Sequence, residues 1–434
     1  MGCVTTTVMD RVLAPGERVE EQLRSTVPPY PSVECHMAVC RSTVAPCGMG
    51  EHSITKSEFV DGLRCERLLW LSRYERDLRS PPSMDERRRL RQGNEVEMRA
   101  RQEFAGGRLI VGVPFDLERA RAETHAALAE GVSVLFQPVF EHDGALVVVD
   151  VLRRDPEDSK AWQLIEVKAS NSLKKPYHLQ DAAVQAHVLR ACGHRVSSVF
   201  VQHLNRDYVH PDRGDLFVLE DVTTAIEDVD VRSSLPRLNR ILDEDKAPGV
   251  VIGPQCKNPY DCSFKEACWS PYGKRTIFFV PKTIHHTRIK RLREIGVVQL
   301  DDIPDEFPLS ADERAGVELI MGRERHGDRD AVQALLGKLE YPIHFLDFET
   351  IDDALPRLEG TRPYQKVPFQ FSCHVLHEDG RLEHFEYLHE ETTDPRPPSS
   401  AYGTSRTSSW RPMSTTASRA RRRSRRCCPS CALS

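Results

Sequence analysis

The chain has 434 residues, of which 39% are hydrophobic and 29% are charged, and its formal net charge is −5. This composition is typical of globular proteins, and the length is sufficient for two or three domains that each bury a core. No run of about 18 or more apolar residues occurs, and the N-terminus lacks the basic and apolar regions of a secretory signal. We therefore expect a cytoplasmic protein without a membrane partner.

The two ends of the chain differ in composition from the rest. Residues 396–434 contain nine Arg and no Asp, Glu or Lys, which leaves residues 1–395 with a formal charge of −14. This Arg/Ser-rich segment cannot bury a core, so we expect a disordered tail. It is either a basic nucleic-acid-binding tail or a frame-shifted or truncated end, and we favour the second. Residues 1–48 show no sustained periodicity, and we expect a disordered extension there too, with Met49 as the true start.

The first ordered element is predicted just after Met49. Ser57 is placed to cap a helix in which Phe59, Leu63 and Leu68 recur at roughly helical spacing. Further along, the pattern predicts helices over 84–104 and 178–191 and strands over 107–114, 132–154, 161–170 and 195–204. This order of helix, strands, helix and strand predicts an α/β domain with a mixed sheet over residues 49–275.

Two further regions follow this domain. Residues 276–335 are mostly helical and polar in pattern, and we expect a helical linker there. It is either a structural connector, which we favour, or a small helix–turn–helix that contacts a DNA backbone. Residues 336–395 are rich in strand-forming residues and predict a hairpin around residues 378–380, where Glu-Asp-Gly supplies the turn.

The strongest chemical signal is a group of polar residues on the predicted mixed sheet. Asp150 follows the apolar stretch "ALVVV", where we expect it to end a strand, and Glu166 and Lys168 lie two apart on the next strand, so these two side chains share a face. If the two strands are neighbours, two carboxylates and an ammonium group converge. The alternative for an isolated Glu-Val-Lys is a solvated strand face, which is the commoner case.

Such a group suits the hydrolysis of phosphodiester bonds. Carboxylate oxygens hold Mg²⁺ or Mn²⁺, and such a metal neutralises a phosphate and lowers the pKa of a bound water. Lys168 would orient that water or stabilise the developing charge. Gln185, on the following predicted helix, would hold the water or the scissile phosphate.

Three cysteines with regular spacing form the second signal. Cys256, Cys262 and Cys268 are separated by two five-residue gaps in "CKNPYDCSFKEAC". Three thiolates leave one position open on a metal centre, and Cys65 in "GLRCERLLW" is the natural fourth ligand. The spacing leaves both zinc and an iron–sulfur cluster open, and buried free cysteines are the structural alternative.

These motifs together resemble a known family. "SEFVDGLRCERLLWL", "GNEVEMRA", "VVVDVLRR", "LIEVKAS", "DAAVQAHVL" and "CKNPYDCSFKEAC" occur in this order over residues 51–275. They resemble the RecB-like PD-(D/E)XK nucleases, and most closely the CRISPR-associated RecB-like exonucleases and their bacterial relatives. The resemblance implies a restriction-endonuclease-like sheet flanked by helices, over residues 49–275.

The resemblance also implies roles for individual residues. Asp150 and Glu166 would be metal ligands, Lys168 catalytic, and Gln185 part of the helix motif. The implied ligands of a [4Fe-4S] cluster, with Zn²⁺ as the alternative, are Cys65, Cys256, Cys262 and Cys268. Many of these nucleases carry a Gly-x-x-x-His metal ligand on the early helix, but at that spacing after Gly93 this chain has Glu97. The Glu97 carboxylate either binds the metal or belongs to a charged helix face.

A second acidic motif lies in the C-terminal unit. Asp347 and Glu349 are two apart after the apolar "PIHFL", as are the metal-binding carboxylates of DnaQ-type, RNase H-like exonucleases. With "GTRPYQKVPFQFSCHVL", this segment resembles the start of the domain-of-unknown-function 2779 family, whose members often follow a RecB-like domain. The other acidic residues and the His of such a site should lie well downstream, and the Arg/Ser-rich tail comes first. We therefore expect a truncated RNase H-like unit over 336–395 whose site is incomplete and inactive.

Three hypotheses follow from the sequence. The first is a Mg²⁺- or Mn²⁺-dependent deoxyribonuclease, expected to be an exonuclease acting on single-stranded DNA or duplex ends, with a structural [4Fe-4S] cluster. A helicase or a repair or defence partner is compatible with it. The second is a catalytically impaired iron–sulfur module that binds nucleic acid, and the third is a truncated or frame-shifted product of a two-nuclease protein. Cleavage that depends on Glu166 would separate the first hypothesis from the second.

Overall fold

The computed structural model describes residues 53–278, 284–322, 329–391 and 393–396. The expectations for residues 1–48, for a start at Met49 and for the tail beyond 396 lie outside these ranges. Within them the chain combines helices with three β-sheets, which confirms the predicted α/β fold class. No helix in the described ranges is long and apolar enough to cross a membrane.

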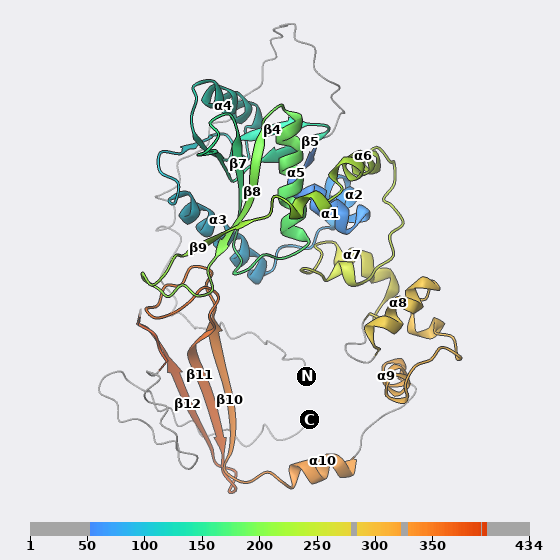
Figure 1. The fold of residues 1–434 in the computed structure, drawn as a ribbon. Helices are drawn as coiled ribbons and strands as arrows, with labels where there is room; N and C mark the ends of the chain where they lie inside the picture. Colours follow the sequence, from blue (N-terminus) through green and yellow to red (C-terminus); the bar gives the residue numbers. More distant parts are fainter. Residues whose placement is uncertain (1–52, 279–283, 323–328, 392, 397–434) are drawn as a thin grey trace, which may run out of the picture. The chain divides into compact units, whose positions relative to one another are not determined.

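Figure 1 shows the helices and strands of the described part of the chain. The α-helices are α1 (Lys56–Arg64), α2 (Glu66–Tyr74), α3 (Met84–Arg101), α4 (Leu117–Ala129), α5 (Tyr177–Ala191), α6 (Val231–Leu242), α7 (Lys265–Trp269), α8 (His286–Glu294), α9 (Ala311–Met321) and α10 (Arg329–Leu336). The 3₁₀ helices are η2 (Arg76–Leu78), η3 (Ala225–Asp228), η4 (Pro254–Cys256), η5 (Ser270–Tyr272) and η6 (Leu300–Asp302). The strands are β1 (Ile54–Thr55), β2 (Arg108–Leu109), β3 (Val134–Phe136), β4 (Val139–His142), β5 (Ala145–Val148), β6 (Val151–Arg154), β7 (Trp162–Lys168), β8 (Val196–Leu204), β9 (Phe217–Asp221), β10 (Ile343–Ile351), β11 (Val367–Leu376) and β12 (Leu382–Leu388).

The main sheet has six strands in the order β2-β3-β6-β7-β8-β9. Strands β6 and β7 are antiparallel, whereas β7 and β8 are parallel and are joined by helix α5. A crossover helix between parallel neighbours packs against the sheet, and Figure 1 shows α5 beside β7 and β8. The sheet is therefore mixed, as the order of the predicted elements indicated.

Strand β7 is buried on both of its faces, and this decides where its polar residues point. Leu164 packs in the same core cluster as residues of α5, whereas Ile165 and Val167 pack with Val96 of α3 in a second cluster. Side chains alternate along a strand. Glu166 therefore shares the α5 face of the sheet with Leu164 and Lys168.

The start of helix α1 differs from the prediction. Ser57 was expected to cap it, but Thr55 does so: its hydroxyl accepts a hydrogen bond from the Glu58 amide, and the Glu58 carboxylate accepts one from the Thr55 amide at 2.9 Å. This capping box starts the helix two residues earlier, because it satisfies two backbone donors reciprocally. Its consequence is that Lys56 becomes the first residue of α1.

The surroundings of Asp150 also differ from the prediction. The apolar run before it was expected to be one strand ending at Asp150, but β5 ends at Val148 and belongs to a separate three-stranded sheet, β1-β5-β4. Strand β6 then begins at Val151 in the main sheet. Asp150 thus lies in the bend where the chain passes from one sheet to the other.

The C-terminal part of the chain contains two smaller packed regions. The residues expected to form a helical linker include α8 and α9, which share a small apolar core around Leu292 and Val317. Strands β10, β11 and β12 form an antiparallel sheet with the predicted hairpin turn, in which the His377 amide bonds to the Arg381 carbonyl at 2.9 Å. The loop between β10 and β11 places Ala354, which is 1% exposed, in the core cluster of α3 and β7.

Candidate functional site

The structure brings Asp150, Glu166 and Lys168 together, as the sequence pattern predicted. The backbone amide of Val167 donates to Asp150 Oδ2 at 2.8 Å, which fixes the bend against strand β7. Lys168 Nζ lies 2.6 Å from Glu166 Oε1. The Glu166 side chain is 1% exposed, so this carboxylate meets other groups of the protein rather than bulk water.

Helix α5 supplies two further polar groups to the same point. Gln185 Nε2 donates to Glu166 Oε2 at 2.7 Å and to Asp181 Oδ1 at 3.3 Å. Lys168 forms an ion pair with Asp181. The sequence pattern predicted a role for Gln185 but not for Asp181, although the two are four residues apart and therefore share a face of the helix. This spacing was the signal that could have found Asp181.

Lys56 is the second site residue that the sequence pattern did not predict. Its Nζ lies 3.3 Å from Asp150 Oδ1 and 3.1 Å from both carboxylate oxygens of Glu166. Lys56 is separated from these partners by 94 and 110 residues, and a lone lysine beside a helix start has no signature in sequence. Its role becomes visible once the capping box of α1 is placed next to strand β7.

The surroundings of Asp150 and Glu166 shift the pKa values of these two carboxyl groups in opposite directions. Burial, together with the nearby negative charge of Glu166, raises the pKa of Asp150 to about 7. Burial acts the same way on Glu166, but the ammonium groups of Lys168 and Lys56 outweigh it and hold the pKa of Glu166 below its usual range. Glu166 is therefore the firmly ionised member of the pair.

Both lysines stay protonated. Burial by itself lowers the pKa of Lys168, but the carboxylates of Asp181 and Glu166 raise it above its ordinary value. The same competition raises the pKa of Lys56, with Asp150 and Glu166 as the largest opposing charges. At neutral pH the site thus holds two ammonium groups among three carboxyl groups.

Glu97 lies near this site, but its carboxylate is engaged elsewhere. Its Oε1 accepts hydrogen bonds from Arg101 at 2.6 Å and from Gln137 at 2.8 Å. Its charge is close enough to contribute to the raised pKa of Asp150. Both bonds are made to Oε1, so a role as metal ligand would fall to the other carboxylate oxygen, Oε2.

The donor set fits a hard divalent cation, on three observations. Asp150 and Glu166 offer carboxylate oxygens, which Mg²⁺ and Mn²⁺ prefer. The buried Oε1 of Gln185 accepts no hydrogen bond, and the Lys56 ammonium supplies a positive charge between the two carboxylates. The described residues nevertheless contain no preformed group of three or more His, Cys, Asp or Glu side chains that could hold a metal ion, so binding would require side chains to move.

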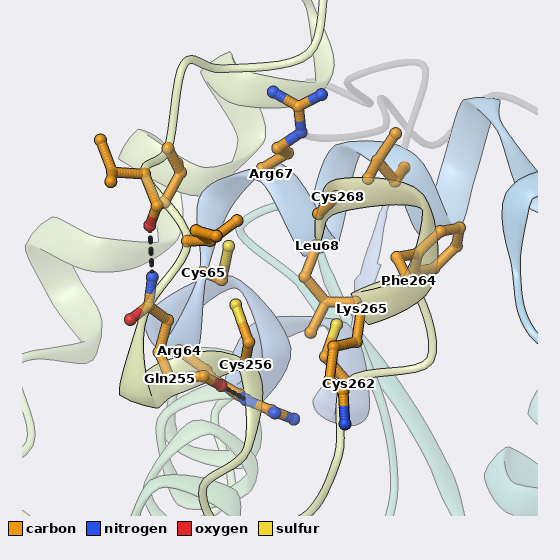
Figure 2. A pocket seen from close by; sticks show the side chains of 14 residues that line it. Arg64, Cys65, Arg67, Leu68, Gln255, Cys256, Cys262, Phe264, Lys265 and Cys268 are labelled. Atoms are coloured by element: carbon orange, nitrogen blue, oxygen red, sulfur yellow. Dashed lines mark hydrogen bonds between the residues drawn. The ribbon is translucent and has the colours of Figure 1, made fainter. Parts of the chain in front are cut away.

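The four predicted cysteine ligands line one pocket (Figure 2). Cys65 comes from the junction of α1 and α2, Cys256 from the end of η4, Cys262 from the loop before α7, and Cys268 from α7 itself. All are free thiols. The structure therefore places Cys65 in one pocket with three cysteines, Cys256, Cys262 and Cys268, that come much later in the chain.

Local turns bring the three late cysteines to the same place. The Cys262 amide donates to the Cys256 carbonyl at 2.8 Å, and the Cys268 amide donates to the Phe264 carbonyl at 3.0 Å. Arg64 ties this segment to α1, since its Nε donates to the Gln255 carbonyl at 2.7 Å (Figure 2). The first five-residue gap is thus closed by a direct backbone hydrogen bond between its cysteines, and the second contains the hydrogen-bonded turn from Phe264 to Cys268.

The absence of a preformed metal-holding group among the described residues includes these four cysteines, so their thiols would have to move together, but the chemistry of the pocket suits a thiophilic metal centre. Burial raises the pKa of the Cys262 thiol to about 11, and it also raises the pKa of Cys65 and of Cys268. Neighbouring thiols add to the effect in each case, because several thiolates in one apolar pocket repel one another. A bound metal would remove this penalty, since it deprotonates its thiol ligands.

Asp347 and Glu349 are exposed on strand β10, two residues apart and on one face. Asp347 Oδ1 accepts a hydrogen bond from the Phe348 amide at 3.0 Å. Among the residues that the structure places, no third carboxylate or histidine joins them in a metal-holding group. The prediction of an incomplete second site stays a prediction.

Matches to known proteins cover parts of the chain. The sequence profile of a family described as a domain of unknown function (DUF2779) matches residues 344–402, which confirms the resemblance predicted for the C-terminal unit. No curated protein matches the chain. A solved structure titled "Crystal structure of SSO0001" is similar at 14% identity with a TM-score of 0.23, over 51% of this chain and 88% of that chain.

Proposed function

We propose that this chain is a Mg²⁺- or Mn²⁺-dependent nuclease that hydrolyses phosphodiester bonds of DNA. The observation that carries the proposal is the convergence of Asp150, Glu166, Lys168 and Gln185 on one buried face of the sheet. Burying two carboxylates and a lysine together costs desolvation free energy when the protein folds. Buried charged groups in close contact are common in active sites, where they stabilise charge or transfer protons during a reaction.

Each residue has a role in this proposal. Asp150 and Glu166 would hold the cation, which supplies charge neutralisation of the phosphate and a water of lowered pKa when bound. Lys168 presents a permanent positive charge to the phosphate or to the attacking water. Gln185 fixes the rotamer of Glu166, and Asp181 orients Lys168, as partners of ligating and catalytic groups commonly do.

The basic helix α3 supports a nucleic-acid substrate. Arg87, Arg89 and Arg91 are exposed on this helix. Glu97 lies further along the same helix, and its negative charge contributes to the raised pKa of Asp150. Exposed arginines can bind the phosphate backbone of a nucleic acid without reading its sequence. These arginines would offer positive charge to a nucleic acid, although the formal net charge of the chain is −5.

The four-cysteine pocket would hold a [4Fe-4S] cluster with a structural role, Zn²⁺ being the alternative. The pocket lies at the C-terminal end of α1, and Lys56, which contacts Asp150 and Glu166, is the first residue of the same helix. A metal centre bound to Cys65 and the 256–268 segment would close a long chain loop and so stabilise the fold.

Cleavage of end-labelled DNA by iron-loaded protein with Mn²⁺ tests the proposal, with single-stranded and duplex substrates compared. We expect Glu166→Gln to reduce the rate at least about 100-fold, because it removes one ligand charge. Glu157→Gln, an equivalent change at an exposed loop position, should leave the rate unaltered.

Equal rates for wild type and Glu166→Gln would refute the proposal. DNA binding without any turnover, unaffected by Asp150→Ala, would instead support a binding module that has lost hydrolysis. Since the proposal assigns no activity to Asp347 and Glu349, the double Ala variant of these two residues should cleave DNA at the wild-type rate.

A further inference from the structure

Lys56 lies where a cation between the two carboxylates would lie. Its Nζ is 3.3 Å from Asp150 Oδ1 and 3.1 Å from Glu166 Oε1 and Oε2. These are the two residues to which the proposed function assigns metal binding. A single ammonium group therefore contacts both proposed ligands at once.

This contact differs from an ordinary surface ion pair. The side chain of Lys56 is 21% exposed, and those of Asp150 and Glu166 are 14% and 1% exposed. The capping box of Thr55 and Glu58 fixes the backbone of the first turn of α1, in which Lys56 is the first residue. The ammonium group is thus delivered to the carboxylates by a defined helix start rather than by a mobile surface chain.

We propose that Lys56 is a positioning residue that occupies the cation site between Asp150 and Glu166 and is displaced when a divalent metal ion binds. The inference rests on the proposed function, because it assumes that these carboxylates bind a metal. Under it, Lys56 keeps the metal-free site neutralised and sets how tightly the metal binds.

Distance and charge make the two occupants mutually exclusive. Mg²⁺ binds carboxylate oxygens at about 2.0–2.1 Å, and the oxygens available to it on Asp150 and Glu166 are those that surround Lys56 Nζ. An ammonium group and a divalent ion on the same oxygens would repel strongly at this separation in a buried site. Lys56 must therefore swing away for the metal to bind.

Lys168 is not the residue that leaves. It bonds to Glu166 Oε1 and also pairs with Asp181, which lies on helix α5 behind the pair. That second anchor would persist if a metal took over Glu166. Lys56 shares both of its carboxylate partners with the proposed metal, so metal binding removes both contacts of Lys56 at once.

Metal titration of a lysine variant tests this. Lys56→Met removes the charge and keeps most of the side-chain volume, and Lys160→Met is the matched control at an exposed loop position. With Mn²⁺ alone and no DNA, calorimetry should show at least about tenfold tighter binding for Lys56→Met than for wild type. Lys160→Met should match wild type.

A second measurement uses the unaltered protein and does not depend on a variant folding. Amine acetylation followed by mass spectrometry should show Lys56 protected without metal and more reactive with saturating Mn²⁺. Lys168 should stay protected in both conditions. The gain in reactivity at Lys56 reports displacement directly, and neither readout uses nuclease activity.

The outcomes separate this inference from the proposed function. If wild type binds Mn²⁺, Asp150→Asn does not, and Lys56→Met binds no more tightly than wild type, the inference is wrong while the metal site stands. Lys56 reactivity that is unaltered at saturating Mn²⁺ would overturn it equally. If neither wild type nor Lys56→Met binds Mn²⁺, the proposed function fails, and the inference fails with it.

Discussion

At the scale of single residues, Glu166 carries the most interactions in the site. Its two oxygens meet Lys168, Lys56 and Gln185, and its side chain is 1% exposed. A buried carboxylate is tolerated when opposite charges and hydrogen bonds replace its hydration. Removing one of these partners should therefore affect both the stability of the protein and the behaviour of the site.

Gln185 allows this to be tested without changing the charge. Gln185→Met deletes the donor to Glu166 Oε2 while keeping a side chain of similar length. We expect Mn²⁺ affinity or cleavage to fall about 10- to 100-fold, because Glu166 loses its orientation. Calorimetry and the cleavage assay measure this, with Gln180→Met on the same helix as the control. Wild-type values for Gln185→Met would show that Gln185 does not position Glu166.

The sequence identified those site residues that belong to a local pattern. Glu166 and Lys168 stand out because they alternate with apolar residues on one strand, and Gln185 follows on the next helix. Lys56 could not be found, because its partners are 94 and 110 residues away and depend on how α1 meets the sheet. Asp181 was visible in principle, since it lies one helical turn before Gln185.

At the scale of elements, the capped start of α1 determines where Lys56 lies. The prediction placed the cap at Ser57, since either a serine or a threonine can begin a helix and the choice depends on which reaches the amide of its third residue. In the structure Glu58 completes the box with Thr55. The first residue of a helix is thus harder to predict than the presence of the helix. Helices α3 and α5 nevertheless begin within one residue of their predicted starts.

The cap has a measurable energetic consequence. Thr55→Ala should lower the free energy of unfolding by about 1 kcal/mol, because the Glu58 amide loses its acceptor. For a domain of this size the melting temperature should fall by about 2–4 °C. Thr55→Ser keeps the hydroxyl and should stay within experimental error of wild type. Equal losses for Thr55→Ala and Thr55→Ser would show that the hydroxyl is not the stabilising group.

The position of Asp150 between two sheets is a second feature that the sequence did not predict. The run from Ala145 to Leu152 is apolar apart from Asp150, but the chain changes sheets in its middle, at the bend that holds Asp150. Periodicity alone does not reveal such a change, because both strands are largely buried on their inner faces. Strands β6 and β7 are nevertheless paired neighbours, as the prediction that Asp150 meets Glu166 and Lys168 required.

The cysteine segment gives a prediction about metal content. Cys262→Ala should lose most of the bound iron and its visible absorption, because the remaining three thiols leave one ligand position unfilled. Cys192→Ala is the matched control, since Cys192 is a partly buried free thiol outside the pocket. A colourless wild-type protein that contains zinc would replace the cluster with a zinc site. Full iron content in Cys262→Ala would remove Cys262 from the ligand set.

At the scale of the whole described chain, the loop after β10 packs on the α3 face of the main sheet. Ala354 lies in the apolar cluster with Val96 and Val167, Tyr364 Oη donates to the Ala169 carbonyl at 2.5 Å, and Arg88 pairs with Asp352 at 2.8 Å. Ala169 directly follows Lys168. The C-terminal unit is thus attached next to the strand that carries the site.

Disrupting this attachment should loosen the C-terminal unit. Ala354→Glu places an unpaired charge in an apolar cluster. We expect limited proteolysis to cut residues 341–396 several times faster in this variant, while Mn²⁺ binding at Asp150 and Glu166 stays at the wild-type level. Glu359→Ala, an exposed change in the same loop, should leave the proteolysis rate as in wild type. An unchanged rate in Ala354→Glu would show that Ala354 does not fasten the loop.

The central claim is that Asp150 and Glu166 hold a metal ion for phosphodiester hydrolysis. The most direct test is the rate of DNA cleavage as a function of Mn²⁺ concentration, for wild type and for Asp150→Asn. Asparagine keeps an acceptor for the Val167 amide and removes the charge. We predict that wild type is inactive without metal and that its rate rises to saturation with Mn²⁺, whereas Asp150→Asn stays inactive throughout. No cleavage by wild type at any Mn²⁺ concentration, or the same saturation curve in Asp150→Asn, would contradict the claim.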